Sequence, residues 1–444
     1  MNRYTQKNTN GFSRIALTVT LPFIILIAGY IVYKLFFIPD PVLSGTEALT
    51  LLPLDKTISL SGENLESVEI SIYQDGIIKE LLKDSPESSE KIYELHVKPR
   101  ELQLKDGDAI IVIKLKSGLL KKQRIEIKTE IDTTPPDLMI MSSPRVIAQG
   151  GTGFAVLQAS GAETVYIKNG EEEYKAFPKI TDSDLDTSMS KSKLIEYFAF
   201  FPVPINTAPG TVFYVLARDE AGNQRVRTIS PRIKEKRFKD SSITISDNFI
   251  DTVVTPLLNK INITNPAESF RHVNEDLRKE SLQKIKEISE NTADRMLWQG
   301  RFLQMKNSKV MAKYGDHRTY MYQNKPVSSS FHLGYDLASH AYAPVEAANS
   351  GIVRFADNLS IYGNTVIIDH GIGLMSIYGH LSTILVVEGQ AVEKGDIIAK
   401  SGATGLAGGD HLHYGILVHG QEVSPLYWWD AKWIGIHITD AIQQ

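Results

Sequence analysis

Five histidine and aspartate side chains near the C-terminal end have the types and spacing of a metal site. His332 and Asp336 stand four residues apart, His380 lies in "SIYGHLS", and His411 and His413 flank one leucine in "GGDHLHYGI". Residues i and i+2 of a β-strand point to the same face, so the last two imidazoles would face one neighbourhood. Two histidines and a carboxylate are a standard zinc complement that leaves a fourth position for water. The alternative reading of the last pair is two surface histidines on a half-exposed strand.

The composition limits what can hold a metal and what can bind this chain. The 444 residues include no cysteine, which excludes disulfides, a thiolate zinc site and a cysteine nucleophile. Any metal must therefore be held by His, Asp or Glu. Nine of the eleven histidines lie beyond residue 300, which favours a C-terminal histidine site. With 48 Lys and Arg against 52 Asp and Glu, the chain lacks a nucleic-acid-binding charge pattern, and we expect no nucleic-acid partner.

Strand-like segments separate the three motifs and must position them. These segments are β-hairpin-like. All five candidate side chains fall within the 82 residues from His332 to His413. The glycines before "HLH" would let the preceding loop turn tightly and line an open groove. We therefore expect a C-terminal antiparallel β domain that gathers the motifs at one site.

Residues from about 296 to 440 resemble the lysostaphin-type (LytM-like) zinc metallopeptidases, which cleave peptides in peptidoglycan. The family pattern is His-x-x-x-Asp, then a strand-borne His in a "YxHL" context, then His-x-His, and all three elements are present. "YGDHR" at 314–318 resembles the turn that precedes the first motif. The resemblance covers about a third of the chain and leaves residues 41–295 unexplained.

The resemblance implies a role for each of the five side chains. His332, Asp336 and His413 would bind one zinc ion (Zn2+) per catalytic domain, and His380 and His411 would be the catalytic pair. Zinc would activate a water and polarise the scissile carbonyl, and the histidine pair would move protons, for which an unperturbed pKa near 6.5 is suitable. The function expected is a zinc metalloendopeptidase acting on cell-wall peptidoglycan peptides, with a barrel-sandwich (duplicated hybrid) catalytic domain.

Several alternatives stay open. The C-terminal domain could be a non-catalytic LytM-like scaffold that binds cell wall or activates a hydrolase. A lipoyl-type carrier or phosphotransfer domain has similar strands, but a carrier needs an exposed lysine beside a methionine at a hairpin tip. His340 is an alternative to His413 as the third ligand, in a His-x-x-x-Asp-x-x-x-His set, and His370 is interpreted as structural. Which histidine of the pair is the general base stays open. The bond cleaved also stays open, among D-Ala to diaminopimelate cross-links, glycine bridges and a protein substrate.

The N-terminal region predicts a membrane anchor. Residues 15–33 carry no charge, and the apolar run is long enough for a bilayer core of about 30 Å. Arg3, Lys7 and Arg14 precede it, so the N-terminus should stay in the cytoplasm. A cleaved signal peptide is the rival reading, but the run exceeds the usual signal core and lacks a small-x-small cleavage site. We expect a single-pass protein of the cytoplasmic (inner) membrane with a periplasmic, extracytoplasmic body, bound to the lipid bilayer and near division or wall-synthesis proteins.

The region between anchor and site is predicted to be mainly β, with one helical segment. Short strand-like runs suggest two β-sandwich-like units divided at "DTTPP", and "ARDEAGN" makes the second resemble bacterial immunoglobulin-like domains. Asn265, Pro266 and Glu268 predict a helix start, and the following charges suggest a solvated face or a segment that covers the C-terminal domain and controls access. The expected organisation is a cytoplasmic tail (1–14), a transmembrane anchor (15–38), a β-sandwich-like domain (41–133), an immunoglobulin-like β-sandwich (134–233), a helical linker (234–300) and a zinc metallopeptidase domain (301–444).

Overall fold

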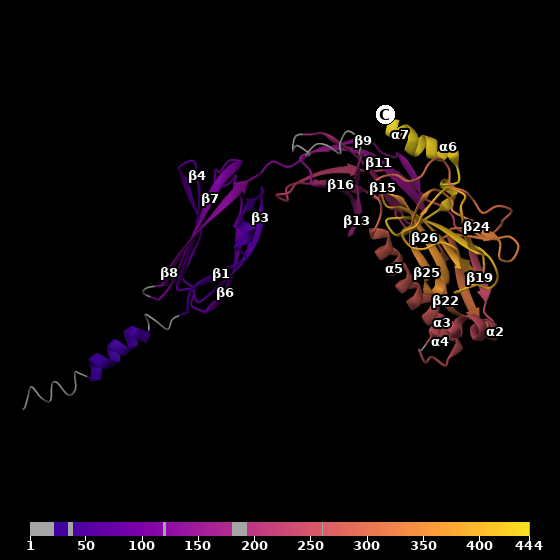
Figure 1. The fold of residues 1–444 in the computed structure, drawn as a ribbon, viewed down its shortest axis with the longest axis horizontal. Helices are drawn as coiled ribbons and strands as arrows, with labels where there is room; N and C mark the ends of the chain where they lie inside the picture. The colour runs from indigo at the N-terminus through magenta and orange to yellow at the C-terminus, as the bar shows by residue number, and fades with distance from the viewer. Residues whose placement is uncertain (1–21, 34–38, 119–120, 180–192, 260, 444) are drawn as a thin grey trace, which may run out of the picture. The chain divides into compact units, whose positions relative to one another are not determined.

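The computed structural model describes residues 22–33, 39–118, 121–179, 193–259 and 261–443. Sheets dominate these residues, which confirms the mainly β prediction (Figure 1). They fall into two compact units that divide between residues 135 and 136, with residues 220–223 grouped with the first unit. The three regions that the sequence separates beyond residue 134 thus lie in one unit.

The predicted anchor falls largely on residues that the structure does not describe. Residues 22–33 form a helix, whereas 1–21 and 34–38, which include the whole predicted cytoplasmic tail, lie outside the described residues. Among the described helices, none has both the length and the apolar character needed to cross a bilayer.

The first unit consists of a three-stranded and a five-stranded sheet that share one apolar core. Alternation produces this arrangement: in "KTISLSGE", Ile58 and Leu60 are buried while the residues between them are exposed. The strand orders are β1–β3–β6 and β2–β8–β7–β4–β5. The elements are β1 (Val42–Ser44), η1 (Thr46–Leu49), β2 (Leu51–Leu52), β3 (Lys56–Glu63), β4 (Ser67–Gln74), β5 (Ile77–Asp84), β6 (Glu90–Val97), β7 (Gly107–Ser117) and β8 (Lys121–Ile131).

The second unit begins with two four-stranded sheets that enclose a core between them. Their strand orders are β14–β15–β11–β9 and β13–β12–β16–β17, and β10 pairs in parallel with β18 beside them. The strands are β9 (Asp137–Ser142), β10 (Val146–Ala148), β11 (Gly151–Ser160), β12 (Thr164–Asn169), β13 (Glu172–Lys175), β14 (Phe177–Pro178), β15 (Ile195–Val203), β16 (Phe213–Arg218), β17 (Gln224–Ile229) and β18 (Arg232–Lys234).

The two central strands of the β14–β15–β11–β9 sheet, β11 and β15, are buried on both faces. Along β15, Ala199 and Phe201 enter the core of the sandwich, whereas Phe198 and Phe200 join the core of the C-terminal region. The ring of Phe200 meets Trp428 edge to face at 5.6 Å between centroids. The unbroken apolar run "YFAFFPV" is explained by this position, because a strand with two buried faces has no polar side. The sandwich is therefore packed against the region that carries the candidate site.

The C-terminal region is built on an antiparallel sheet with strand order β20–β23–β31–β27–β26–β25–β29, and β32 pairs with β31. Two three-stranded sheets, β24–β30–β28 and β19–β21–β22, accompany it. Their strands are β19 (Asp240–Thr244), β20 (Lys309–Ala312), β21 (Asp316–Tyr322), β22 (Lys325–His332), β23 (Tyr335–Ala338), β24 (Pro344–Glu346), β25 (Gly351–Asn358), β26 (Asn364–Gly371), β27 (Leu374–Leu381), β28 (Thr383–Ile384), β29 (Ala391–Val392), β30 (Ile397–Lys400), β31 (Leu412–Val418) and β32 (Gln421–Val423).

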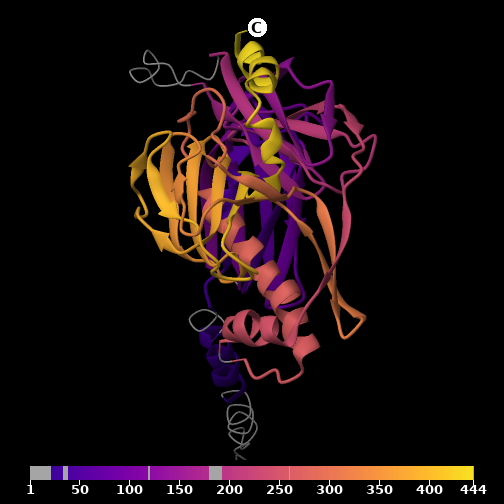
Figure 2. The ribbon, with the colours of Figure 1, turned by 90° about the vertical axis from the view of Figure 1, so that its right-hand side faces the viewer.

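The segment predicted as a helical linker packs on this sheet rather than standing free. The expected helix start is confirmed, because Asn265 Oδ1 accepts hydrogen bonds from the amides of Ala267 and Glu268. Phe270, Val273 and other apolar residues of the segment share one core with the sheet, and the helix lies along it in Figure 2. The segment also contains strand β19. Its helical elements are α2 (Asp247–Phe249), η3 (Ile250–Val254), α3 (Thr255–Leu258), α4 (Pro266–His272), η4 (Val273–Leu277) and α5 (Arg278–Glu290).

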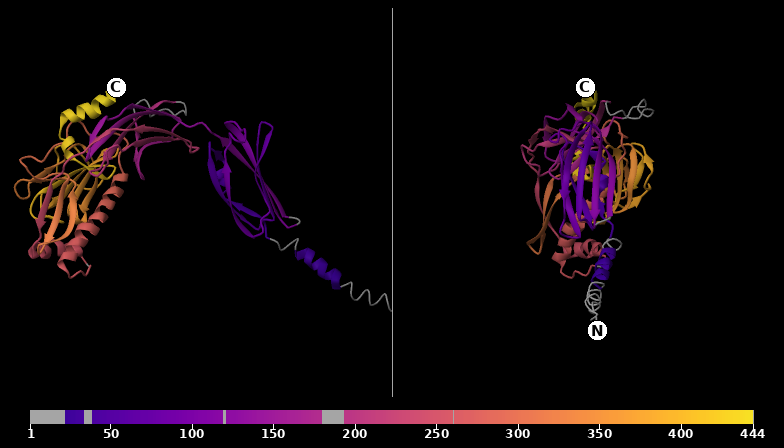
Figure 3. Two further views of the ribbon diagram at one scale, coloured as in Figure 1. Left: turned by 180° about the vertical axis from the view of Figure 1, so that it is seen from behind. Right: turned by 90° about the vertical axis from the view of Figure 1, so that its left-hand side faces the viewer.

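The aromatic C-terminal segment closes the region. Trp428 is fully buried, and Ile438 and Ala441 enter the same core as Phe154 of the sandwich. Figure 3 shows the last helices beside the sandwich strands. The remaining helical elements are η5 (Ser360–Tyr362), η6 (Pro425–Tyr427), α6 (Ala431–Ile434), η7 (Gly435–Thr439) and α7 (Asp440–Gln443).

Phe200→Ala should destabilise the C-terminal region although it lies in the sandwich. Removing a fully buried phenylalanine costs roughly 3–5 kcal/mol. All four tryptophans lie between residues 298 and 433, so their fluorescence during urea unfolding reports on the C-terminal region alone. Tyr214→Ala, at a 48% exposed position of the sandwich, is the matched control and should change little. An unshifted tryptophan transition in Phe200→Ala would contradict this coupling.

Candidate metal centre and active site

Three predicted ligands converge where β22, β23 and β31 meet. His332 Nε2 lies 2.8 Å from Asp336 Oδ1 and 3.0 Å from His413 Nδ1, and the last two atoms are 3.2 Å apart. The strand register produces this, since Asp336 and His413 are direct partners in the β23–β31 ladder. Gly334 leaves the necessary room, because a Cβ there would stand 2.6 Å from the His413 ring.

The donor set fits a zinc ion. Donor atoms bound to one tetrahedral zinc at about 2.0–2.1 Å stand about 3.3 Å apart, close to the separations seen here. His332 Nδ1 lies 3.0 Å from the carbonyl oxygen of Lys313. A carbonyl only accepts, so Nδ1 carries the proton and the lone pair of Nε2 faces the cluster. The three donor atoms thus already lie within a few tenths of an ångström of the separations that a zinc ion requires.

His380 and His411 stand beside the cluster as a pair. Their ring centroids are 4.8 Å apart, and His411 Nε2 lies 3.5 Å from Asp336 Oδ1. Each ring donates from Nδ1 to a backbone carbonyl, of Thr404 and Gly409 respectively, at 2.8 Å. The Nε2 atom of His380 therefore keeps its lone pair, whereas Nε2 of His411 faces the Asp336 carboxylate. The structure thus brings together all five side chains that the sequence singles out.

The backbone of His380 is held in a strained conformation. Its φ of 61° lies in the left-handed region that non-glycine residues seldom adopt. The strain occurs where β27 loses its regular pairing, between Gly379, which faces His413, and Leu381, which faces Asn364. Such strain is often found at functional sites, where it aims a side chain.

Burial and mutual charge set the pKa values of the site. Burial lowers the pKa of His413 to about 4, and burial followed by repulsion from His411 and His413 lowers that of His380 to about 3. For His411, burial acts downward, but the hydrogen bond and charge of Asp336 outweigh it and raise the pKa. For Asp336, burial acts upward, but the charge of His332 and hydrogen bonds from the histidines keep the pKa well below its usual value. Asp336 is thus a carboxylate, and two of the imidazoles are neutral.

All five side chains line one cavity of about 380 Å³. One wall comes from β19 and the start of α2, through Ile243, Ile245 and Phe249. Sequence reasoning missed this wall, because nothing in that stretch has the residue types of a site. The sequence left open whether residues 234–300 pack over the C-terminal domain. In the structure they do, since Phe270 and Val273 share a core with its sheet.

Arg318 is a further member of the site to which sequence reasoning gave no role. Its Nη2 donates to Asp336 Oδ2 at 3.0 Å, which leaves Oδ1 facing the three histidines. The signal was present in "YGDHR", which had been noted only as a turn. Which carboxylate it would meet depends on the pairing of β21 with β22, which sequence spacing does not reveal.

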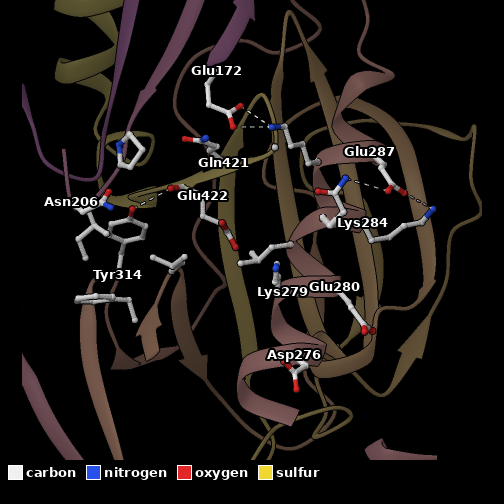
Figure 4. A pocket seen from close by; sticks show the side chains of 18 of the residues that line it. Glu172, Asn206, Asp276, Lys279, Glu280, Lys284, Glu287, Tyr314, Gln421 and Glu422 are labelled. Carbon is white, nitrogen blue, oxygen red and sulfur yellow. Dashed lines mark hydrogen bonds and ion pairs between the residues drawn. The ribbon is translucent and has the colours of Figure 1, made fainter. Parts of the chain in front are cut away.

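A larger groove of about 1150 Å³ lies elsewhere on this unit, and Figure 4 shows it beside α5. Its lysines are largely taken up by ion pairs, Lys286 with Glu172 and Lys284 with Glu287. Glu422 links it to the site, because its Oε1 accepts a hydrogen bond at 2.8 Å from Tyr362, which packs edge to face on His413. Burial raises the pKa of Glu422. The candidate metal ligands line the smaller cavity, so that cavity is the candidate active site.

The remaining histidines take structural or surface positions. His340, the alternative ligand, is exposed and lies outside the cluster. His370 is fully buried, with Nδ1 2.8 Å from the Ser350 carbonyl and Nε2 2.7 Å from Ser376 Oγ, as its structural reading predicts. His419 packs against Tyr174 and Phe177 of the sandwich. His317 and His437 likewise lie outside the cluster, beside Phe331 and Trp433.

Comparison with known proteins confirms the resemblance read from the motifs. Residues 330–425 match Peptidase family M23. Over 95 residues the chain is 39% identical to the DD-carboxypeptidase/endopeptidase Mpg of Neisseria meningitidis serogroup B and 42% identical to the peptidoglycan DD-endopeptidase ShyA of Vibrio cholerae serotype O1. Each alignment covers 21% of this chain and 22% of the relative.

Among solved structures, the catalytic domain of lysostaphin from Staphylococcus simulans is 26% identical to this chain, with a TM-score of 0.25. The match covers 29% of this chain and 96% of the lysostaphin domain. The chain spans 22% of the length of the curated relatives named above. The family match itself concerns residues 330–425.

The buried His370 should make the fold lose stability in acid. Burial lowers its pKa from 6.5 to about 4, so the unfolded chain binds the extra proton between those values. Above pH 6.5 the neutral His370 does not reduce the free energy of unfolding. As the pH falls from 6.5 to 4, the free energy of unfolding decreases by about 3 kcal/mol at most. Urea unfolding from pH 7 to 4 measures it. His370→Gln should flatten this pH dependence, whereas His340→Gln should not; equal slopes in wild type and His370→Gln would contradict the assignment.

Proposed function

We propose that the M23 domain at residues 330–425 makes this chain a membrane-anchored zinc metalloendopeptidase that hydrolyses peptide bonds of cell-wall peptidoglycan. The observation that carries the proposal is the convergence of His332, Asp336 and His413 within 3.2 Å of one another, with His380 and His411 beside them. The chain is also similar to relatives named as a DD-carboxypeptidase/endopeptidase and a peptidoglycan DD-endopeptidase.

In this proposal His332, Asp336 and His413 hold the metal, and His380 and His411 handle protons. Bound zinc supplies Lewis acidity, which polarises the scissile carbonyl and lowers the pKa of water to near 7. His411, whose pKa the neighbouring Asp336 raises, is placed to donate a proton to the developing oxyanion. His380 donates from Nδ1 to the Thr404 carbonyl and is neutral, so its Nε2 lone pair is placed to accept a proton from the attacking water and then return it to the leaving amine.

The competing proposal is a non-catalytic cell-wall scaffold or hydrolase activator. A scaffold has no need for five titratable side chains around one cavity, nor for a strained His380. Burying such groups costs free energy, and a site that only binds wall could replace them with apolar residues. The retained set therefore favours catalysis.

The anchoring of the protein is a separate part of the proposal. It is supported by the uncharged run at 15–33, the basic residues that precede it and the helical conformation of residues 22–33. The body would then act on wall close to the membrane, in growth or division, together with wall-synthesis proteins.

Substitutions at His413 and His411 should separate metal binding from catalysis. His413→Ala removes a ligand, so the purified protein should hold far less than one zinc and release no fragments from peptidoglycan. His411→Ala keeps the three ligands, so it should retain zinc and lose hydrolysis by about a hundredfold or more. Metal analysis and chromatography of released fragments measure the two properties. His340→Ala, an exposed histidine near the same motif, is the matched control.

Two results would contradict the proposal. Wild-type protein without zinc would remove the basis of the mechanism. Zinc-loaded protein that binds wall but cuts no peptide bond would instead favour the scaffold.

The anchor should be visible by extraction. Full-length protein should stay in the membrane fraction after alkaline carbonate washing, whereas a variant lacking residues 1–38 should be released. External protease should digest the body of the full-length protein in osmotically opened cells. Release of the full-length protein by carbonate would contradict the anchor and leave the peptidase assignment untouched.

A further inference from the structure

Two arginines line the candidate catalytic cavity, and each has guanidinium N–H groups that are not engaged in the hydrogen bonds described here. Arg318 donates one hydrogen bond, from Nη2 to Asp336. Arg278, the first residue of α5, donates from Nε and Nη2 to Asn274 of its own helix, at 3.0 and 2.8 Å. Among the described residues, Arg278 forms no ion pair. Each guanidinium therefore keeps N–H groups for a further acceptor.

The charged side chains that line the cavity favour binding of an anion. Asp336 is its only carboxylate among the described lining residues, and Arg318 already pairs with it. A zinc ion would add two positive charges to those of the arginines. Glu422, which attracts Arg278, stands behind Tyr362 and faces the other groove. Unbalanced positive charge in a partly enclosed cavity is unfavourable unless a ligand brings negative charge.

We propose that Arg318 and Arg278 form a subsite for a free carboxylate on the substrate residue that supplies the leaving amine. The proposal rests on the proposed peptidase function and specifies its substrate class. Arginine suits this task because its planar fork binds carboxylates through charge-assisted hydrogen bonds. Arg318 acts next to the reacting atoms, since it contacts Asp336 and lies close enough to influence His411.

This chemistry discriminates between the bonds that the motifs leave open. In hydrolysis, water adds to the carbonyl carbon, the C–N bond breaks, and a proton passes to the leaving amine. When that amine belongs to a D-Ala at a peptide terminus, or to the diaminopimelate of a cross-link, the carbon that carries it also carries a carboxylate. The interior of a glycine bridge has no such group. The subsite therefore favours the first two substrates over a glycine bridge.

The test is binding of a small probe by the full-length, zinc-free protein. Acetyl-D-Ala-D-Ala with a free carboxylate is compared with its C-terminal amide by titration calorimetry, so the arginines act without the metal. The free acid should bind about tenfold tighter or better, as expected for charge-assisted hydrogen bonds. Arg278→Gln, which touches no proposed ligand, should reduce the preference to about threefold or less. Arg271→Gln, at an exposed position of α4 outside the cavity, is the matched control and should keep the preference.

Arg318→Gln provides a second variant and should also lose the preference, with its zinc content measured because Arg318 supports Asp336. Equal binding of acid and amide by wild type, or a preference that survives in both Arg278→Gln and Arg318→Gln, would overturn the subsite. Hydrolysis of the two probes by zinc-loaded protein separates the failures. Cleavage with no preference for the free acid would contradict the subsite and support the peptidase. Preferential binding of the free acid without cleavage would support the subsite and contradict the peptidase.

Discussion

The buried carboxylate of Asp336 is the group on which the site depends. One oxygen faces His332, His411 and His413, and the other accepts from Arg318. A carboxylate in this position is tolerated because both oxygens have partners. Its placement is a matter of register: a one-residue slip of β23 against β31 would turn Asp336 away from His413. The free energy that secures the register thus also secures the chemistry.

Packing on both sides of the sheet secures that register. β27 and β31 are buried along their whole length, so neither can slip without exposing apolar side chains. One side is completed by aromatic residues that include Phe200 of the sandwich, and the other by the helical segment through Phe270 and Val273. Residues outside the M23 match therefore supply part of the core that holds the site. The sandwich and the helical segment therefore contribute to the core that supports the site.

The sequence was sufficient to identify the five side chains that cluster and insufficient to identify the residues around them. The five side chains were predictable because metal ligation demands particular residue types, and strand periodicity restricts their spacing. The helix start at Asn265 was predictable because capping is local. Arg318, Arg278 and the wall at Ile243 were not, because their roles arise from pairings between distant strands and helices. The run "YFAFFPV" did carry a local signal of a doubly buried strand, but it does not say which surface covers the second face.

The cavity residues that the sequence predicted and those that it did not predict come from different parts of the chain. The five side chains that would perform hydrolysis lie at or after residue 332, within the region shared with the M23 relatives. Arg278, Arg318 and the apolar wall all precede residue 330. Related chains can therefore share the bond-breaking chemistry while differing in the part that meets the substrate. Arg278 stands at the start of α5, whose position depends on the core formed by Leu277 and Ile285, so packing of this helix determines where a cavity charge lies. In the proposed peptidase, substrate choice would thus depend on how the helical segment packs, and metal binding would depend on the register of the sheet.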